Sequence, residues 1–594
     1  MTARIVEFNS RVAMNAGNPE SPAMRAERVA ISTTHRSCYL AQGVQTGSGN
    51  ALSSFASAWS FREPSKIVPT SLPSEENSLD AVDQSWLHTI YDSGFETVFG
   101  SWMGRYSNPF AFGEQSLSDI VSIRRLCSQL DKWIEDGHDG TGTMVDFGAS
   151  PESFRNENDL QIDHYLDCSI QGFAARWLPL VFPTETEVVP RLEIVRALWR
   201  RAHRDMLKVI NRPSYRSMLA LLLFALTPIP VGIGEDEELD GVSGQHCVHA
   251  ALQQIQTLRA RQRSLQFNGT RVSLASVRRT SATSPQSLAT TNFINAESTA
   301  YWAALTFDTS ASLTMSCRPL LSSGLFGFDA EPSWRMVRTC TEIFKGMTKD
   351  WKELDFEMTN EKANQIIASG AAWKLLQWKL TANLKESLRD GHDEVEVDKA
   401  FNAVSDAIDH FNATYRDLLS ACQTRIQFFS QETKLRWYEL VMHYNLSILM
   451  VPDIVATTHR EDLLSLFSSK RMNAETWVMN CLEFGLNNKY TLQLRSETGA
   501  SDPKAPFTQK SSITVPLVAV DPYPHHVVAA VKLMQQAIER DSSRGKIGPD
   551  AHNNLLSTLR QTLEQLPQCS KSVQMARAEF AKPENPSQPA YPPW

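Results

Sequence analysis

Four cations are spaced four residues apart along one predicted helix, and they form the most regular charged pattern in the sequence. They are Arg196, Arg200, Arg204 and Lys208. Positive charge concentrated on one helical face can hold DNA phosphates or an acidic partner. The pattern equally suits a solvated face whose cations pair with acids of the same chain, such as Glu193. Without an Asn, Gln or aromatic base reader beside them, the cations are not expected to select a DNA sequence.

Two histidine pairs have spacings that invite a test for metal binding. His246 and His249 lie three residues apart on a predicted helix, where both imidazoles can reach one ion, but no carboxylate at helical spacing completes the set. A satisfied helix surface is therefore expected there. His525 and His526 are neighbours at the start of an apolar helix, where adjacent side chains point apart, so capping or packing is expected.

An acidic cluster beside Gly391 raises the possibility of a magnesium-dependent isoprenoid synthase. Its members are Asp393, Glu394, Glu396 and Asp398. A diphosphate site needs carboxylates on two facing helices, and the sequence offers no convincing second set. Because the cluster directly precedes a helix, stabilisation by the positive N-terminal end of that helix accounts for it.

The usual sequence signatures of enzymes and metal sites are absent. There is no G-x-x-x-x-G-K-[ST], no G-x-G-x-x-G after a strand, no H-E-x-x-H and no G-x-S-x-G. The nine cysteines form no C-x-x-C pair, which argues against a disulfide framework or a zinc knuckle. The sequence therefore predicts no enzyme, no catalytic residue, no metal ligand and no cofactor.

The segments that carry these residues show mostly the periodicity of helices. Arg212-Pro213 ends the helix that carries the cations, and Ser214 is expected to cap a very apolar helix that runs to Leu226 in the centre of the domain. The best candidate for a strand is 512–520. The predicted fold class is all-α, with further helices over 331–348, 361–389, 397–430, 431–451, 473–484, 525–540 and 551–566.

Composition limits the partners and divides the chain. With 58 Lys+Arg against 66 Asp+Glu among 594 residues, the net charge of −8 excludes a polycation that coats nucleic acid. The longest apolar run, 218–226, is too short to span a bilayer, so no membrane partner is expected. Shifts in composition predict a mobile arm at 1–80, a first helical part at 81–267, a linker at 268–292, a second helical part at 293–568 and a disordered Pro-rich tail at 569–594.

Several segments resemble the fungal-specific transcription-factor regulatory domain, also called the middle homology region. The resemblance begins in 164–167, 212–216 and 250–258 and is strongest from Glu297 to Pro319, in the order of an acid, an aromatic pair, an aspartate and a late proline. The motif residues are Glu297, Tyr301, Trp302, Asp308, Arg318 and Pro319. It spans about 160–330 and, more loosely, the helical remainder.

The chain departs from that family at two points. Ser298-Thr299-Ala300 stands where the family has basic residues, so the salt bridges of those cations are missing. The family usually carries an N-terminal zinc cluster of six cysteines, whereas 1–126 contains only Cys38. Zinc would be expected only if a cysteine cluster preceded this sequence.

The resemblance implies a nuclear transcription regulator of a fungus, with a helical regulatory and dimerisation domain. Its expected partners are other transcription regulators or a second copy of itself, with DNA bound weakly or through a partner; a cytoplasmic location is the alternative. We expect Tyr301 and Trp302 to pack in the core and Asp308 to make a buried polar contact, with Arg318 as the candidate partner. Two alternatives remain open: a repressor or co-regulator without DNA contacts, and a secondary-metabolism enzyme that uses a cavity in the helical domain.

Overall fold

The computed structural model describes most of the helical regions predicted from the sequence. The residues that it describes are 85–113, 118–138, 157–181, 188–262, 291–315, 317–321, 331–352, 357–458, 460–493 and 512–581. All of them belong to one unit of the chain. The predicted arm at 1–80, nearly all of the linker at 268–292 and the end of the tail from 582 lie outside the described residues.

A first group of helices surrounds α10 (Tyr215–Leu226), which is buried along its length from Tyr215 to Phe224. The Ser214 side chain accepts a hydrogen bond from the Ser217 amide and caps this helix, as predicted. Because every face of α10 is apolar, it needs neighbours on all sides, and α6, α7, α9 and α12 supply them. The group comprises α4 (Ser85–Tyr91), α6 (Ile123–His138), α7 (Glu157–Ala174), α8 (Leu178–Val181), α9 (Val188–Ile210), α11 (Glu235–Leu239) and α12 (Gly244–Gln262).

A second group of longer helices is built on α15 and α17, which pack against each other. Their caps are side chains: Thr359 accepts from the Lys362 amide at the start of α15, and Ser430 accepts from the Thr433 amide at the start of α17. The group comprises α14 (Pro332–Met347), α15 (Asn360–Arg389), α16 (Glu394–Arg425), α17 (Gln431–Ala456), α18 (Glu461–Asn487), α20 (Pro524–Ser543), α21 (Pro549–Gln565) and α22 (Lys571–Phe580).

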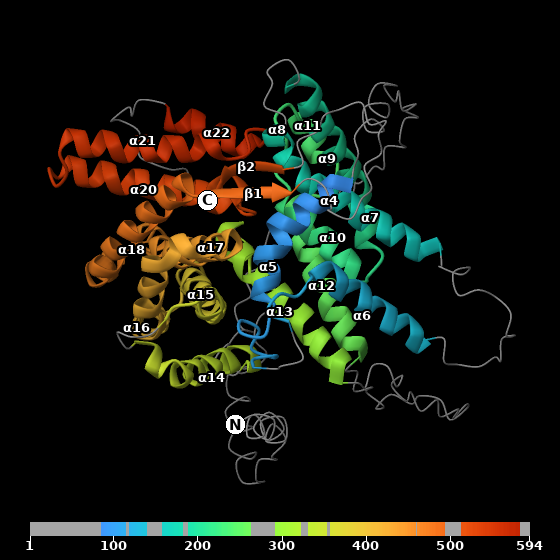
Figure 1. The fold of residues 1–594 in the computed structure, drawn as a ribbon, viewed down its shortest axis with the longest axis horizontal. Coiled ribbons are helices and arrows are strands. Elements are labelled where there is room, and N and C mark those ends of the chain that lie inside the picture. The colour runs from blue at the N-terminus through green and yellow to red at the C-terminus, as the bar shows by residue number, and fades with distance from the viewer. Residues whose placement is uncertain are drawn as a thin grey trace, which may run out of the picture. The chain divides into compact units, whose positions relative to one another are not determined.

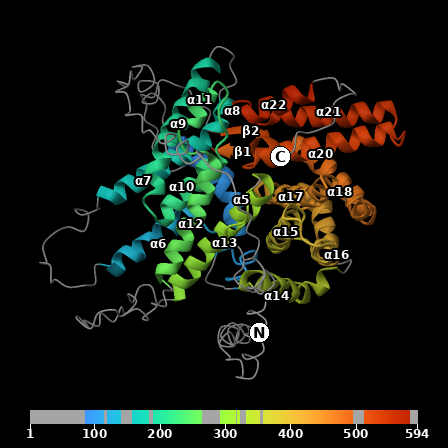
Figure 2. The same ribbon diagram turned by 180° about the vertical axis from the view of Figure 1, so that it is seen from behind.

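Two helices join the groups. In Figures 1 and 2, α5 (Thr97–Trp102) and α13 (Thr291–Thr314) lie between the green helices of the first group and the yellow to red helices of the second. Helix α13 contacts α6 and α12 on one side and α15 on the other, and α5 contacts α15 and α17. The buried apolar residues of both groups form one continuous core.

The all-α prediction is confirmed, with two local corrections. The expected strand over 512–520 is half strand: β2 (Ser512–Pro516) pairs antiparallel with β1 (Lys489–Gln493), and the chain then turns into the short helix α19 (Leu517–Val520). The tail begins later than predicted, because Ser570 caps α22, which buries Val573 and Ala576. The described part of the chain contains no helix both long and apolar enough to cross a bilayer.

Candidate functional site

The two groups of helices meet around a cavity. It is lined by side chains from α5, α10, α13, α15, α17 and the start of α20. The space open to the centres of water molecules measures about 30 Å³, which is room for about two or three waters. Its polar lining consists of Thr306, Ser310, Lys374, His443, Tyr523 and His526, and the rest is aromatic or aliphatic.

A chain of polar contacts runs along one wall of this cavity. The Ser310 hydroxyl of α13 lies 3.3 Å from Nε2 of His526 at the start of α20. Nδ1 of His526 lies 3.1 Å from Nε2 of His443 on α17, and that nitrogen lies 3.2 Å from Oε2 of Glu439, one turn earlier on the same helix. A hydroxyl, two imidazoles and a carboxyl group thus follow one another within hydrogen-bonding reach.

Burial favours the uncharged forms of the two histidines and the glutamate in this row of polar contacts. It lowers the pKa of His443 and of His526 well below the ordinary histidine value, and nearby Lys374 lowers both further. Burial, and then the neighbouring carboxyl group of Asp521, raise the pKa of Glu439 well above its ordinary value. At neutral pH both imidazoles are therefore neutral, and the Glu439 carboxyl holds its proton more readily than an exposed carboxyl does. If Nε2 of His443 carries the proton, it can donate to Nδ1 of His526, and Nε2 of His526 can then donate to the Ser310 hydroxyl.

Lys374 brings a cation to the opposite side of the cavity. It belongs to α15, it is 4% exposed, and its ammonium nitrogen lies 3.8 Å from the centre of the Trp102 ring. Burial lowers its pKa to about 7, although the Glu439 carboxyl acts in the other direction. No hydrogen bond joins this ammonium to an acceptor in the described part of the chain. A cation placed in the core in this way is costly, and a cation–π contact offsets only part of the cost.

Two more buried donors belong to the same region. The Trp102 indole stacks on the Tyr523 ring, with 5.8 Å between ring centres. Neither Nε1 of Trp102 nor the Tyr523 hydroxyl has a hydrogen-bond partner among the described residues. Tyr523 is held at the entrance to α20, where its amide donates to Oδ1 of Asp521 over 2.7 Å and Pro524 opens the helix.

The strongest motif residues of the sequence analysis are architectural. Glu297 on α13 forms an ion pair with Arg259 on α12 over 2.7 Å, and the Arg259 guanidinium lies 3.6 Å from the centre of the Tyr301 ring. Trp302 is 1% exposed and donates from Nε1 to the Trp102 carbonyl over 3.1 Å. The predicted core position of Trp302 is confirmed, whereas Tyr301 is half-buried beneath Arg259.

The prediction that pairs Asp308 with Arg318 is wrong. Asp308 is buried and accepts hydrogen bonds from the amides of Leu320 and Leu321, at 2.8 and 3.0 Å. Arg318 is 65% exposed and instead pairs with Asp390. The segment around half-buried Pro319 brings the two amides that follow it back to α13. These backbone donors need acceptors, and the Asp308 carboxylate accepts from both, so it is satisfied without the distant Arg318 guanidinium.

The cation stripe on α9 is largely paired within the chain. Arg196 bonds Glu193 over 2.5 Å and the Val231 carbonyl over 2.7 Å. Arg200 pairs with Glu237 of α11, and Lys208 bonds Asp205 over 3.0 Å. Arg204 is exposed, and its Nε lies 3.4 Å from the Arg200 carbonyl oxygen. Binding of this stripe to DNA or to an acidic partner stays a prediction.

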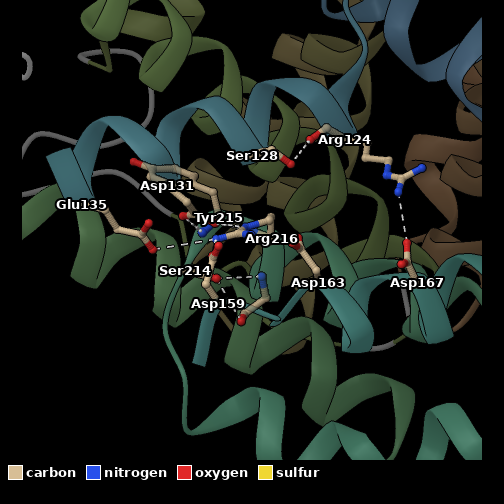
Figure 3. A network of polar contacts seen from close by, with 11 residues as sticks. Arg124, Ser128, Asp131, Glu135, Asp159, Asp163, Asp167, Ser214, Tyr215 and Arg216 are labelled. Atoms are coloured by element: carbon tan, nitrogen blue, oxygen red, sulfur yellow. Dashed lines mark hydrogen bonds and ion pairs between the residues drawn. The ribbon is translucent and has the colours of Figure 1, made fainter. Parts of the chain in front are cut away.

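A second buried ionic network lies at the start of α10 (Figure 3). Asp131 of α6 accepts from the amides of Tyr215 and Arg216, at 2.7 and 3.1 Å, and from Nε of Arg216 at 2.9 Å. The same guanidinium also pairs with Asp159 and Asp163 of α7. Because all of its donors point at acids of the neighbouring helices, this network ties α6 and α7 to α10 and offers no cation to a ligand.

Two acidic or metal-like groupings have structural explanations. Asp393 caps α16 by accepting from the Glu396 amide, and Asp398 pairs with Arg460, so this cluster stabilises a helix start as expected. His164, Cys168 and Asp205 place possible metal ligands within 4.8 Å of one another. The Asp205 carboxylate is already paired with Lys208. Burial raises the pKa of the Cys168 thiol to about 11, which disfavours the thiolate that binds metals, so these groups are poorly suited to a metal ion.

Sequence reasoning missed most of the central cavity. It noticed His526 but interpreted it as capping or packing, and it did not single out Lys374, His443, Glu439 or Tyr523. A usable signal was present, because Lys374 interrupts the apolar segment 371–376 and the Glu439/His443 pair stands one helical turn apart inside the apolar helix α17. A charge within a helix that has no solvent-facing side requires a polar partner in the core.

Comparison with known proteins gives no match: no family model, no curated protein and no solved structure matches this chain. The fold is all-α, with a largely apolar cavity in its core that a few buried polar side chains also line.

Proposed function

We propose that this chain is the helical regulatory part of a fungal transcription regulator, which acts by binding effectors and partner proteins rather than by catalysis. It would work in the nucleus, as a dimer or with another regulator, and would reach DNA weakly or through that partner. The proposal starts from the resemblance of about 160–330 to the fungal regulatory domain, carried by Glu297 to Pro319.

The observation that supports it most is the cavity at the joint between the two groups of helices. Its polar lining is buried apart from half-buried Ser310, and helices of both groups contribute to it. An occupant of such a cavity touches helices from both groups at once, and it can favour one arrangement of them over another. That property suits a regulatory domain better than an enzyme with rapid turnover.

A tethering experiment tests the proposal. The full chain is fused to a DNA-binding module of known operator, and the transcript of a reporter behind that operator is measured in a fungal host. We expect the transcript to rise or fall several-fold relative to the module alone, and we expect Trp302→Ala, which disrupts the joint between α13 and α5, to lose the effect. If the fusion protein is present in the nucleus at its normal cellular level and the transcript is unchanged, the proposal is contradicted.

The second candidate is an enzyme that uses the same cavity, and the Ser310–His526–His443–Glu439 chain is the observation that favours it. If Nε2 of His526 accepts the Ser310 proton, the hydroxyl becomes a nucleophile for acyl transfer, in the manner of a serine supported by a histidine and a carboxyl group. Esterase activity of the purified chain on short acyl esters, lost in Ser310→Ala and kept in Thr314→Val, one turn further along α13 and outside the cavity lining, would favour the enzyme over the regulator.

A further inference from the structure

We propose that a second pocket, formed by α16, α17 and α18, binds a small aromatic carboxylate that also carries a hydrogen-bond donor, a hydroxybenzoate being the simplest example. This pocket shares no lining residue with the central cavity. The inference goes beyond the proposed function, because it depends neither on the resemblance to the fungal domain nor on the central cavity. Its binding test can therefore succeed or fail whatever the reporter experiment gives.

The pocket has a buried floor and a rim that reaches solvent. Tyr444 and Asn445 of α17 are buried. Arg416 of α16 is exposed, and Asn473 and Trp477 of α18 are half-buried. The space open to the centres of water molecules measures about 30 Å³. Because exposed and half-buried side chains line this space, a small molecule can enter it from solvent.

Arg416 sets the charge of the ligand, because among the residues that line the pocket it alone carries a charge. No ion pair or hydrogen bond joins its guanidinium to another residue in the described part of the chain. Burial raises the pKa of the Tyr444 hydroxyl well above its ordinary value; the charge of Asp409 raises that pKa further and the charge of Arg416 lowers it. The Asp409 carboxylate is already paired with Lys470 over 2.7 Å. The free guanidinium can hold a carboxylate through two parallel hydrogen bonds.

Asn445 requires a donor from the same ligand. Its side chain lines the pocket and is 5% exposed, and its Nδ2 donates to the Val441 carbonyl over 2.8 Å. No hydrogen bond joins its Oδ1 to a donor in the described part of the chain, so this buried acceptor favours an O–H or N–H group on the ligand. The carboxamides of Asn412 and Asn473 can donate or accept, so they suit either end of the ligand. An anion that only accepts hydrogen bonds would leave Oδ1 unmatched.

The apolar lining favours a flat ring. The Phe411 and Tyr444 rings stack, with 3.6 Å between their centres and 19° between their planes, and Trp477 adds a third aromatic side chain. A free space of about 30 Å³ holds about two or three waters, which limits the ligand to a single ring whose carboxylate stays at the rim beside Arg416. For a ligand of about ten heavy atoms we expect a dissociation constant between about 0.1 and 10 mM.

Titration calorimetry of the full chain tests the inference. The probes are sodium 3-hydroxybenzoate and 4-hydroxybenzoate, compared with benzoate, acetate, benzyl alcohol and phenyl phosphate. We expect saturable binding of at least one hydroxybenzoate, at least about threefold tighter than that of benzoate. Acetate, benzyl alcohol and phenyl phosphate should bind more weakly than the hydroxybenzoate.

Two variants separate the charge from the donor. Arg416→Gln should weaken hydroxybenzoate binding at least about tenfold with an unchanged melting temperature, because the side chain is exposed and makes no contact that the fold needs. Asn445→Leu should abolish the preference for hydroxybenzoate over benzoate, because it removes the acceptor that distinguishes them. The matched control is Arg425→Gln, which removes an exposed arginine of the same helix outside the pocket lining and should leave binding unchanged.

Four results would each overturn the inference. They are no saturable binding of either hydroxybenzoate up to about 50 mM by the folded chain, equal binding by Arg416→Gln, binding of benzyl alcohol as tight as that of the hydroxybenzoate, and tighter binding of phenyl phosphate than of the hydroxybenzoate. The last result would assign the pocket to a phosphate ester instead of a carboxylate.

Discussion

Replacing Lys374 by methionine should make the folded chain more stable at neutral pH, although it removes a residue of the candidate site. Burial lowers the pKa of this lysine from 10.5 to about 7. At 1.36 kcal/mol for each tenfold change in acidity, holding its ammonium in the core costs about 5 kcal/mol. The contact with the Trp102 ring returns about 2 kcal/mol. Methionine fills a similar space, so we expect a net gain of about 3 kcal/mol.

The pH dependence of that gain distinguishes this cause from better packing. In the unfolded chain the lysine keeps its ordinary pKa, so between about pH 7 and pH 10 the unfolded state binds more protons than the folded state. The free energy of unfolding of the natural chain should therefore rise over this interval, because removing the lysine proton on folding costs less as the pH approaches the ordinary lysine pKa. The methionine variant has no such proton, so its advantage is full at and below pH 7 and shrinks toward pH 10.

Urea denaturation, followed by far-ultraviolet circular dichroism at about pH 7 and about pH 9.5, measures both effects. Lys399→Met is the control: this lysine of α16 is exposed and pairs with Glu396 at 3.9 Å, so its replacement should change the free energy of unfolding by less than about 1 kcal/mol at both pH values. The reasoning is refuted if Lys374→Met destabilises the chain to the same extent at both pH values. That result would mean that a partner in the folded state already compensates the charge.

Three further predictions concern stability and chemistry elsewhere in the chain. Trp302→Ala should lower the free energy of unfolding by about 3–5 kcal/mol, because it empties a fully buried aromatic position; an unchanged urea midpoint would contradict the packing described. Asp131→Asn should cost about 3–5 kcal/mol by depriving the buried Arg216 of its most deeply buried anion, whereas Asp167→Asn, at a half-exposed ion pair, should cost less than about 1 kcal/mol. Purified chain with Mg²⁺ and prenyl diphosphates should give no hydrocarbon or alcohol product, and product that disappears in Asp393→Ala would contradict the structural role of that carboxylate.

The helices could be predicted well because their signals are local. Arg212-Pro213 and Ser214 mark the end of α9 and the start of α10 by backbone chemistry alone, and the side chain of Ser214 makes the expected capping bond. The expected helix at 361–389 differs from α15 by one residue at its start. The strand at 512–520 was only half right because apolar β-branched residues, such as Val518 and Val520, are equally at home in a short buried helix.

Polar contacts in the core were harder to predict from the sequence, because they depend on which helices pack against each other. Asp308 illustrates the difficulty. The motif order suggested a salt bridge to the nearby Arg318, but the carboxylate instead binds the amides of Leu320 and Leu321, which no sequence pattern marks as donors in need of an acceptor. Arg216 shows the same limit from the other side, because its acids come from two helices that precede it by more than fifty residues.

The central cavity combines both difficulties. Lys374 and His443 lie in helices whose local sequence pattern already indicates burial. Hydrophobic periodicity and helix propensity therefore give no reason for a lysine in α15 or a histidine in α17. The physical rule that a buried charge needs a counterpart turns these two residues into a prediction that α15 and α17 share a polar interior. It does not say which other side chains line that interior. The Trp102 and Tyr523 rings stack on each other there although they lie more than four hundred residues apart in the sequence, and no local pattern marks such a meeting.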